Sequence, residues 1–241
     1  MKPKQTKIVI LAAGIGSRLR PLTNKIPKCL IEVNNVSLIK RIVNQIQSFN
    51  KDLVPIIIGG YKFEVLSEHL KDLEVSLIEN KDYLSTNNMY SLHLAINEMV
   101  DNDILIINGD CIYEDEIVYK MLETDDSRIA IIKTEFNEEA MKVRVNNQGI
   151  ISEMSKSLMK QNDVFVSMDM YRLSKKDIML LKEVIKTYID KNEKNLWTEF
   201  AINDILFKTE IAPLDFSDKK WFEIDTLEDL EKAEIKFTDE V

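Results

Sequence analysis

The chain has 241 residues, of which 45% are hydrophobic, 30% charged and 7% aromatic. This length suits one large domain with an ample core, and the apolar content excludes a disordered chain. Two cysteines, Cys29 and Cys111, exclude a disulfide-stapled scaffold and a multi-cysteine metal site. No apolar run has the length of a signal-peptide core or of a membrane span, so we expect a soluble, cytoplasmic protein without a membrane partner.

The formal net charge of −9 argues against nucleic acid as a partner, because that role needs a basic face. The charge is unevenly distributed, since residues 1–33 contain seven lysines and arginines but a single acid, Glu32. A cationic segment on an acidic protein favours a small polyanionic ligand over a long polymer. Arg18 and Lys28 lie outside the lysine-rich first residues and need an explanation other than solubility.

In the first half of the chain, hydrophobic periodicity predicts alternating strands and helices. Strands are expected where short apolar runs occur, at residues 7–12, 53–58, 75–78, 104–107 and 129–134. Helices are expected where apolar residues recur every three to four positions, at residues 37–49, 63–70, 88–99 and 114–122. This alternation is typical of a Rossmann-like α/β fold, a mostly parallel sheet flanked by helices that binds ligands at the carboxyl ends of its strands.

The second half of the chain follows a different pattern. Strands are expected at residues 142–145 and 150–154 around a hairpin turn, and at 164–171 and 221–224. Helices are expected from the Ser174 cap to about residue 190, over residues 198–207 starting at Thr198, and from the Thr226 cap to residue 237. Because no repeat or linker divides the chain, we expect a single domain.

The segment after the first predicted strand, Leu11-Ala-Ala-Gly-Ile-Gly-Ser-Arg-Leu, is the most informative part of the sequence. Gly14 and Gly16 let backbone N–H groups turn inward and approach a phosphate chain closely. Arg18 can place two guanidinium N–H groups on phosphate oxygens, and Lys28 follows a proline that keeps the chain extended. A strand, a glycine turn, an arginine and a later lysine predict a cradle for a nucleoside triphosphate.

Other phosphate-binding motifs fit this segment less well. A dinucleotide fingerprint needs a third glycine or alanine where Leu19 stands, and a Walker loop needs a Gly-Lys-Ser/Thr sequence that the chain does not contain. The alternative is an ordinary tight turn with surface cations, which Gly-x-Gly alone would favour.

Asp110 is a candidate metal ligand by its own position, whereas Asp225 is one mainly through resemblance to a known family. Asp110 follows an apolar strand and a glycine, at the edge where α/β folds bind ligands. Mg²⁺ takes one or two carboxylates together with waters and substrate phosphates, so two aspartates suffice. The alternatives are a turn-forming Asn-Gly-Asp sequence for Asp110 and, for Asp225, an acid near a helix N-terminus.

Leu11-Ala-Ala-Gly-x-Gly-x-Arg-Leu, together with Pro27-Lys28, resembles the signature of nucleotidyltransferases that make NDP-sugars and CDP-alcohols, in the NTP transferase or MobA-like superfamily. Later motifs follow in the family's order over nearly the whole chain. Asn108-Gly109-Asp110 is similar to the strand-end aspartate that binds magnesium, and Glu223-Ile224-Asp225 is similar to the segment with the second magnesium aspartate.

Further motifs point to one branch of that family. Asn87-Asn88-Met89-Tyr90-Ser91-Leu92 resembles the phosphocholine and phosphonate cytidylyltransferase branch, as do Lys142-Val143 and Ser155-Lys156. Val166-Ser167-Met168-Asp169 departs from the sugar enzymes, which have a glycine in this motif. The first three segments favour a phosphorylated alcohol or a phosphonate as the acceptor, whereas the missing glycine leaves the acceptor site open.

The resemblance implies a Mg²⁺-dependent cytidylyltransferase, which joins CTP to a phosphocholine-like phosphorylated alcohol or a phosphonate and releases pyrophosphate. Asp110 and Asp225 would hold the metal, and Arg18 and Lys28 would be the catalytic cations. A sugar-1-phosphate nucleotidylyltransferase is one alternative, and a non-catalytic nucleotide-binding regulatory module is an alternative of another class.

The resemblance also assigns binding residues and partners. The expected nucleotide-binding residues are Leu11, Ala12, Ala13, Gly14, Gly16, Ser17, Gly60, Asn87 and Asn88. The expected acceptor-binding residues are Lys142, Lys156, Tyr171, Trp197 and Trp221. The two tryptophans could enclose a quaternary ammonium group, with core packing as the alternative. Expected partners are CTP and a small acceptor, and a homodimer is compatible with this function.

These assignments divide the single domain into three functional parts. Residues 1–140 would form the nucleotide-binding core, and residues 141–215 would form an acceptor-side lobe. Residues 216–241 would supply the second metal aspartate and a closing helix.

Overall fold

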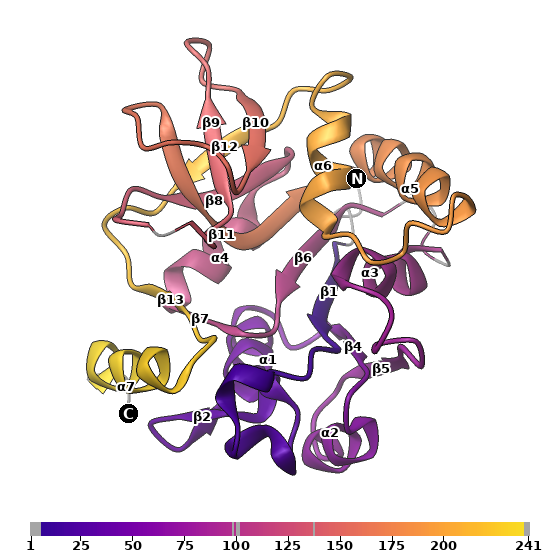
Figure 1. Ribbon diagram of the computed structural model, residues 1–241, viewed down its shortest axis with the longest axis vertical. Helices are drawn as coiled ribbons and strands as arrows, with labels where there is room; N and C mark the ends of the chain where they lie inside the picture. Colours follow the sequence, from indigo (N-terminus) through magenta and orange to yellow (C-terminus); the bar gives the residue numbers. More distant parts are fainter. Residues whose placement is uncertain (1–5, 98, 100–101, 137, 239–241) are drawn as a thin grey trace.

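The computed structural model describes residues 6–238 except 98, 100, 101 and 137. Its main strands are β1 (Lys7–Ala12), β4 (Ile56–Gly59), β5 (Ser76–Glu79), β6 (Ile104–Asn108), β8 (Arg128–Ile132), β9 (Lys142–Val145), β10 (Ile151–Ser155), β11 (Val164–Leu173) and β12 (Ala212–Asp215). Within the described residues these strands form one nine-stranded sheet in the order β10-β9-β11-β6-β1-β4-β5, and β8 joins β12 to β11 (Figure 1). The sheet is parallel across β6, β1, β4 and β5 and becomes antiparallel at β11.

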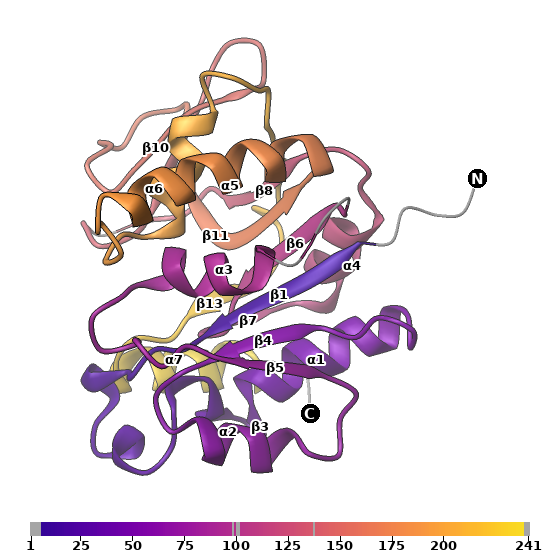
Figure 2. The ribbon, with the colours of Figure 1, turned by 90° about the vertical axis from the view of Figure 1, so that its right-hand side faces the viewer.

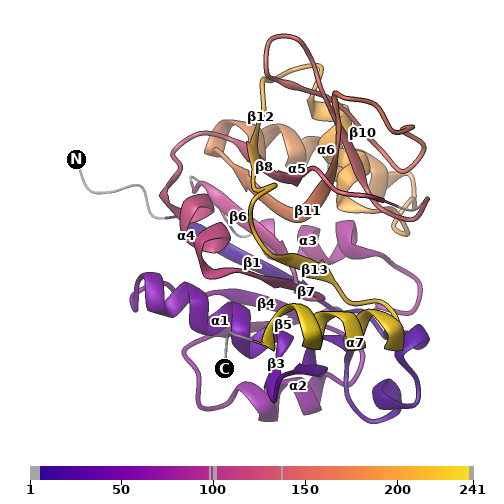
Figure 3. The same cartoon turned by 90° about the vertical axis from the view of Figure 1, so that its left-hand side faces the viewer.

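Helices cover both faces of this sheet. The α-helices are α1 (Leu38–Phe49), α2 (Phe63–Leu70), α3 (Asn88–Ile96), α4 (Asp115–Glu123), α5 (Lys175–Asp190), α6 (Thr198–Ile205) and α7 (Leu227–Lys236). One apolar cluster joins the sheet to α1, α2 and α4, and a second joins its other face to α3, α5 and α6. Figure 2 looks onto the face with α3, α5 and α6, and Figure 3 onto the side with α1, α4 and α7.

Strand β1 shows why the sheet lies between two helical layers. Ile8 and Ile10 point into the cluster with α1, whereas Val9 and Leu11 point into the cluster with α3. An apolar run of this kind is buried on both faces, as in a parallel sheet. The carboxyl ends of β1, β4 and β6 therefore meet at one edge.

Two short ribbons accompany the main sheet. Strands β2 (Glu32–Val33) and β3 (Val36–Ser37) pair with each other, and β7 (Cys111–Tyr113) pairs with β13 (Trp221–Glu223). Three single-turn 3₁₀ helices occupy Ser17–Leu19, Leu22–Asn24 and Lys28–Leu30. Helix α7 packs with β2 through a third apolar cluster that includes Ala233 and Phe237.

Most predicted elements are present, and several boundaries differ. The strands at 7–12 and 142–145 and the helix at 63–70 have the predicted bounds. The helix predicted to end at residue 99 ends at Ile96, and residue 98 lies outside the described residues. Strands β7 and β12 were not predicted. Thr198 was predicted to cap α6, but the N-cap residue is Trp197. Thr198 is the first residue of the helix itself and is fully buried.

Two caps were predicted correctly. Ser174 Oγ accepts from the backbone N–H of Asp177 at the start of α5. Thr226 and Asp229 form a reciprocal capping box at the start of α7, with each side chain accepting from the other residue's backbone N–H. Among the described residues, no helix combines the length and the apolar character that crossing a membrane requires.

Candidate active site

A cavity of about 1040 Å³ opens at the carboxyl ends of β1 and β6. Its walls combine the loop after β1, the end of β6, the start of α3, residues 134–136 and 138–141, and the connection from β13 to α7. This is the edge at which open α/β sheets bind ligands. Most of the predicted site residues come from these same segments.

The glycine loop after β1 is shaped by Gly16. This residue has a φ of +66°, and a Cβ built on it would lie 2.8 Å from the Cβ of Lys28, so any side chain there would be strained and crowded. Thr23 Oγ1 donates a hydrogen bond to the Gly16 carbonyl oxygen at 2.8 Å. Among the described residues, nothing lies within 4 Å of a Cβ built on Gly14. Gly16 thus fixes the turn, while Gly14 leaves the cavity wall open.

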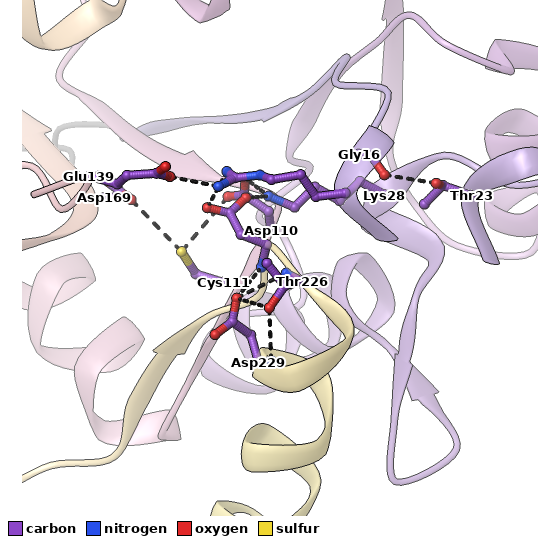
Figure 4. A network of polar contacts seen from close by, with 11 residues as sticks. Gly16, Thr23, Lys28, Asp110, Cys111, Glu139, Asp169, Thr226 and Asp229 are labelled. Atoms are coloured by element: carbon purple, nitrogen blue, oxygen red, sulfur yellow. Dashed lines mark hydrogen bonds and ion pairs between the residues drawn. The ribbon is translucent and has the colours of Figure 1, made fainter. Parts of the chain in front are cut away.

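Two cations and three acids form an ion-pair network at the cavity floor (Figure 4). Lys28 Nζ lies 2.7 Å from Asp110 Oδ2 and 2.6 Å from Asp225 Oδ1. Arg18 lies 2.8 Å from Asp225 Oδ2 and 2.6 Å from Glu139 Oε2. Burial acts to lower the pKa of Lys28, but the charges of Asp110 and Asp225 outweigh it and raise that pKa. The structure therefore brings together all four residues predicted to be catalytic or metal-binding.

Asp110 and Asp225 are distant in sequence, and the short ribbon makes them neighbours. Strand β7 begins directly after Asp110, and its first residue, Cys111, is paired with Glu223 of β13. The backbone N–H of Ile224 donates to the carbonyl oxygen of Asp110 at 3.0 Å. This pairing places the end of β13 beside the end of β6.

A third carboxylate joins this cluster. Asp110, Glu223 and Asp225 each offer an oxygen that lies within 4.8 Å of the others. Burial and the charges of Asp110 and Asp225 raise the pKa of Glu223 from 4.5 to about 8. Glu223 stands two residues before Asp225, and side chains two apart in an extended chain point to the same side. The prediction of Asp225 as a metal ligand therefore also indicated Glu223.

Five of the predicted nucleotide-binding residues line the cavity: Leu11, Ala13, Gly14, Asn87 and Asn88. Ala12 instead packs into the core beside α1, and Gly60 packs against Tyr83, whose Cβ would lie 2.7 Å from a Cβ on that glycine. Gly16 and Ser17 lie at the start of the first 3₁₀ helix, outside the cavity wall that the described residues form. Gly16 contributes to the site by fixing the shape of the glycine loop.

The two asparagines also hold the local structure. Asn87 is the N-cap of α3, and its Oδ1 accepts from the backbone N–H of Asn88. Asn88 Oδ1 accepts from the backbone N–H of Thr198 at 2.8 Å, which ties α3 to α6. Both roles are structural, and both side chains nevertheless remain part of the cavity wall.

Three of the predicted acceptor-binding residues line the cavity. The Lys156 ammonium lies 4.1 Å from the centre of the Trp197 ring, and Trp221 lies on the wall near Asp225. Trp221 Nε1 is buried and has no hydrogen-bond partner among the described residues. Lys142 Nζ instead donates to two backbone carbonyl groups, and Tyr171 is fully buried beneath the cavity wall.

A family model described as a MobA-like NTP transferase domain matches residues 8–161 of the chain. The chain belongs to the MobA-like NTP transferase family. Among its curated relatives, 2-aminoethylphosphonate cytidylyltransferase of Lancefieldella rimae is 29% identical, and the chain spans 48% of that relative's length. CTP:phosphoglutamine cytidylyltransferase of Campylobacter jejuni is 27% identical, over 92% of this chain and 97% of that one.

Solved structures share the fold of this MobA-like transferase. CTP:phosphocholine cytidylyltransferase of Streptococcus pneumoniae superposes with a TM-score of 0.84 at 22% identity, over 96% of this chain and 98% of that one. The inositol-1-phosphate CTP transferase of T. maritima superposes with a TM-score of 0.78 at 20% identity. At these identities the likeness establishes the fold, and it confirms the predicted fold class.

The MobA-like transferase also has a buried polar network that the sequence analysis missed. The Tyr171 hydroxyl lies 2.7 Å from Glu199 Oε1 and 3.0 Å from Asp169 Oδ1. Burial and the neighbouring charges of Glu223, Glu199 and Asp110 raise the pKa of Asp169 well above its ordinary value. Glutamate at the start of a helix is normally exposed, so nothing in the sequence pattern predicts that Glu199 is buried.

Neither cysteine has the properties of a nucleophile. Burial raises the pKa of Cys29 to about 12, and burial together with the charge of Asp110 raises that of Cys111 well above its ordinary value. The thiolate is the reactive form, so these thiols are inert at neutral pH.

The raised pKa of Glu223 makes the stability of the metal-free protein depend on pH. Between about pH 5 and 8 the folded state holds a proton on Glu223 that the unfolded state has released, so the free energy of unfolding falls as pH rises, by about 1 kcal/mol per pH unit. Glu223→Gln should reduce this slope by the contribution of one proton, while the buried Asp169 keeps its own contribution. Urea unfolding in EDTA at several pH values measures it, with the exposed Glu68→Gln as control. An unchanged slope in Glu223→Gln would contradict the assignment.

Proposed function

We propose that the protein is a Mg²⁺-dependent cytidylyltransferase. It would join the CMP part of CTP to a phosphorylated alcohol or a phosphonate and release pyrophosphate. The observation that carries this proposal is the meeting, at one cavity, of a glycine loop, two cations and three carboxylates. The cytidylyltransferase names of the relatives support CTP as the nucleotide and a phosphorus-bearing acceptor.

The reaction needs positioning and charge neutralisation more than it needs a base. An acceptor oxygen that is already anionic attacks the α-phosphorus of CTP, a new P–O bond forms, and the bond to the bridging oxygen of the β-phosphate breaks. Pyrophosphate leaves with that electron pair, and no proton has to move. Neither histidine is needed as a base: His69 contacts Ser37 Oγ and His93 contacts Asn97, both outside the cavity.

The donor set at the cavity floor fits a divalent metal ion. Asp110, Glu223 and Asp225 would hold it, because carboxylate oxygens are the ligands that Mg²⁺ prefers. Burial and then the charges of Asp110 and Asp225 raise the pKa of Glu223 although Lys28 lies nearby, so a bound cation would stabilise the charged form of this carboxylate. When bound, Mg²⁺ supplies positive charge that stabilises the phosphate oxygens in the transition state.

The remaining residues would position the two substrates. Arg18 and Lys28 would place their positive charges beside the phosphates. Asn87 and Asn88 offer amide groups to the base or the ribose, and Lys156 is the candidate for the acceptor phosphate. Lys142 and Tyr171 were also predicted to bind the acceptor, and these roles remain proposals. Both side chains would act indirectly, by supporting residues that line the cavity.

Arg18→Ala is expected to lower kcat about a hundredfold while changing the KM for CTP much less. Arg18 borders the glycine loop, so its hydrogen bonds would tighten as charge develops on the leaving pyrophosphate. Steady-state kinetics measure both constants, and the exposed neighbour Arg20→Ala is the matched control. If only the KM for CTP rises in Arg18→Ala, then the residue contributes uniform binding and its proposed role is wrong.

A screen of pyrophosphate release tests the proposed function. The four NTPs are each combined with phosphocholine, phosphoethanolamine, 2-aminoethylphosphonate and hexose 1-phosphates. We expect CTP with an alcohol phosphate or a phosphonate to react best. Preference for a hexose 1-phosphate would favour the sugar-nucleotide alternative, and NTP binding without turnover would favour the regulatory module.

A further inference from the structure

One end of the cavity is acidic in a way that the transfer reaction does not require. Asp169 and Glu199 both line it, with only 7% and 4% of their surfaces exposed. The hydroxyl of Tyr171 lies between them, within hydrogen-bond distance of both carboxylates. A phenol has one hydrogen to donate, so it can satisfy only one of the two carboxylates at a time.

Asp169 retains an oxygen without a strong donor. The one contact of its Oδ2 is the thiol of Cys111, a weak donor at 4.0 Å, and the same thiol lies 3.8 Å from Asp110 Oδ1. Among the residues that the structure describes, no N–H or O–H group reaches this oxygen. A buried carboxylate oxygen without a donor is costly, so a hydrogen-bond donor brought by a ligand fits this position.

The backbone at Asp169 is also unusual. Its φ is +56°, in the middle of strand β11, where the register with β8 shifts between Ser167 and Tyr171. Aspartate tolerates this conformation better than most residues, but glycine adopts it more easily. Irregularities of this kind can redirect a side chain out of the regular alternation of a strand, and here the carboxylate lies on the cavity wall.

The nearby lysines are engaged elsewhere. The Lys156 ammonium lies over the Trp197 ring, and Lys28 is paired with Asp110 and Asp225. Neither donates a hydrogen bond to Asp169 or Glu199: Lys156 acts on Glu199 only through its charge, and among the described residues Asp169 has no cation in contact. A positively charged ligand group would supply both the missing charge and the missing donor.

We propose that Asp169, together with Tyr171 and Glu199, binds a primary or secondary ammonium group at the end of the acceptor that does not carry phosphorus. The inference rests on the proposed function and names its acceptor class. A trimethylammonium group carries the same charge but has no N–H, so it cannot donate to Asp169 Oδ2. Sites built around hydrogen bonds discriminate strongly against ligands that lack the matching group.

A series of acceptors that differ only in this group tests the selectivity of the wild-type protein. The probes are phosphoethanolamine, its N-methyl and N,N-dimethyl derivatives, phosphocholine, and 2-hydroxyethyl phosphate as the uncharged analogue. With CTP, kcat/KM should be highest for phosphoethanolamine and at least about tenfold lower for phosphocholine and 2-hydroxyethyl phosphate. A kcat/KM for phosphocholine equal to or above that for phosphoethanolamine would overturn the inference.

Substitutions assign the selectivity to Asp169. Asp169→Asn should raise the KM for phosphoethanolamine about tenfold or more, leave the KM for CTP within about twofold, and reduce the preference over 2-hydroxyethyl phosphate. Asp169→Gly suits the local φ, so it removes the carboxylate without straining the backbone. Asp126→Asn, at a side chain that is 80% exposed, is the control. Equal losses for all acceptors in both Asp169 variants would contradict a role in recognising ammonium.

Calorimetric binding separates this inference from the proposed function. Phosphoethanolamine and phosphocholine are titrated into the protein with a non-hydrolysable CTP analogue present. Tighter binding of phosphoethanolamine, lost in Asp169→Gly, supports the ammonium site even if no acceptor reacts. Indifference to the head group rejects it even if CTP transfer is confirmed.

Discussion

Asp110→Asn is expected to lower kcat at least about a thousandfold, equivalent to about 4 kcal/mol of transition-state stabilisation, while the fold persists. Asparagine keeps the shape of the side chain but removes the charge that would hold the metal. Asp110 Oδ2 also lies 2.7 Å from Lys28 Nζ. The variant would therefore lose both a metal ligand and the ion pair with Lys28. Pyrophosphate release with excess Mg²⁺ measures the effect, and circular dichroism checks the fold.

Asp218→Asn, at a side chain that is 76% exposed, is the matched control for the loss of one negative charge. Chelation of divalent ions should abolish wild-type turnover, and added Mg²⁺ should restore it. Near-normal kcat in Asp110→Asn, or turnover that chelation does not change, would contradict the metal assignment.

Lys28→Met should impair both stability and catalysis. The substitution leaves Asp110 and Asp225 close together without the ammonium group that they share. Removing one partner from a buried ion pair costs about 3–5 kcal/mol, and because these carboxylates are about a quarter exposed we expect about 2–4 kcal/mol here. We also expect kcat to fall at least about a hundredfold, because a positive charge beside the phosphates is lost.

The stability loss in Lys28→Met has a specific pH dependence. In the wild type, Lys28 and Arg18 overcome the effect of burial and hold the pKa of Asp225 below its ordinary value, so that contribution is present above the unfolded pKa and is lost as pH falls. The difference in Tm between variant and wild type should therefore be largest near neutral pH and shrink as pH falls below about 4, the ordinary pKa of an aspartate. Mg²⁺ should reduce it at neutral pH.

Thermal unfolding with and without Mg²⁺ measures this difference, and the exposed neighbour Lys25→Met is the control. A Tm deficit that is the same at every pH and with or without Mg²⁺ would indicate lost packing instead of lost charge compensation. An unchanged Tm would show that the network gives no net stabilisation.

The parts of the site that the sequence predicted are those encoded locally. In the segment from β1 to Gly16, the apolar run predicts a buried strand and the two glycines predict the turn that follows it. Asp110 could be placed because it follows a buried strand directly. In each case, the residues that determine the local structure lie within a few positions of one another, so the sequence pattern is sufficient to predict it.

The features that were missed depend on contacts between distant segments. Strand β7 has three residues, and its pairing with β13 brings the segment with Glu223 and Asp225 beside Asp110. The orientation of Asp169 follows from a shift in register inside β11, which hydrophobic periodicity does not show. Glu199 is buried because Tyr171 and α3 lie against it, and its position in α6 alone would place it at the surface.

For Lys28, the sequence predicted its position beside the glycine loop but not the residues with which it pairs. Its position after a proline predicted a phosphate ligand, and its proximity to the glycine loop is as expected. Its ammonium group pairs with two carboxylates that enter the site from β6 and from the end of β13. Each of these residues was predicted as part of the site, but the contact of both carboxylates with the same Lys28 nitrogen could not be predicted from the sequence.

The most direct measurement follows the phosphorus atoms of CTP through the reaction. The protein is incubated with Mg²⁺, phosphoethanolamine and CTP labelled either at the α- or at the γ-phosphate, and the products are separated. Nucleotidyl transfer predicts that the α-label enters a CDP-linked product and that the γ-label leaves in pyrophosphate. A γ-label found on the acceptor, or an α-label recovered only as CMP or CDP without the acceptor, would contradict the proposed reaction.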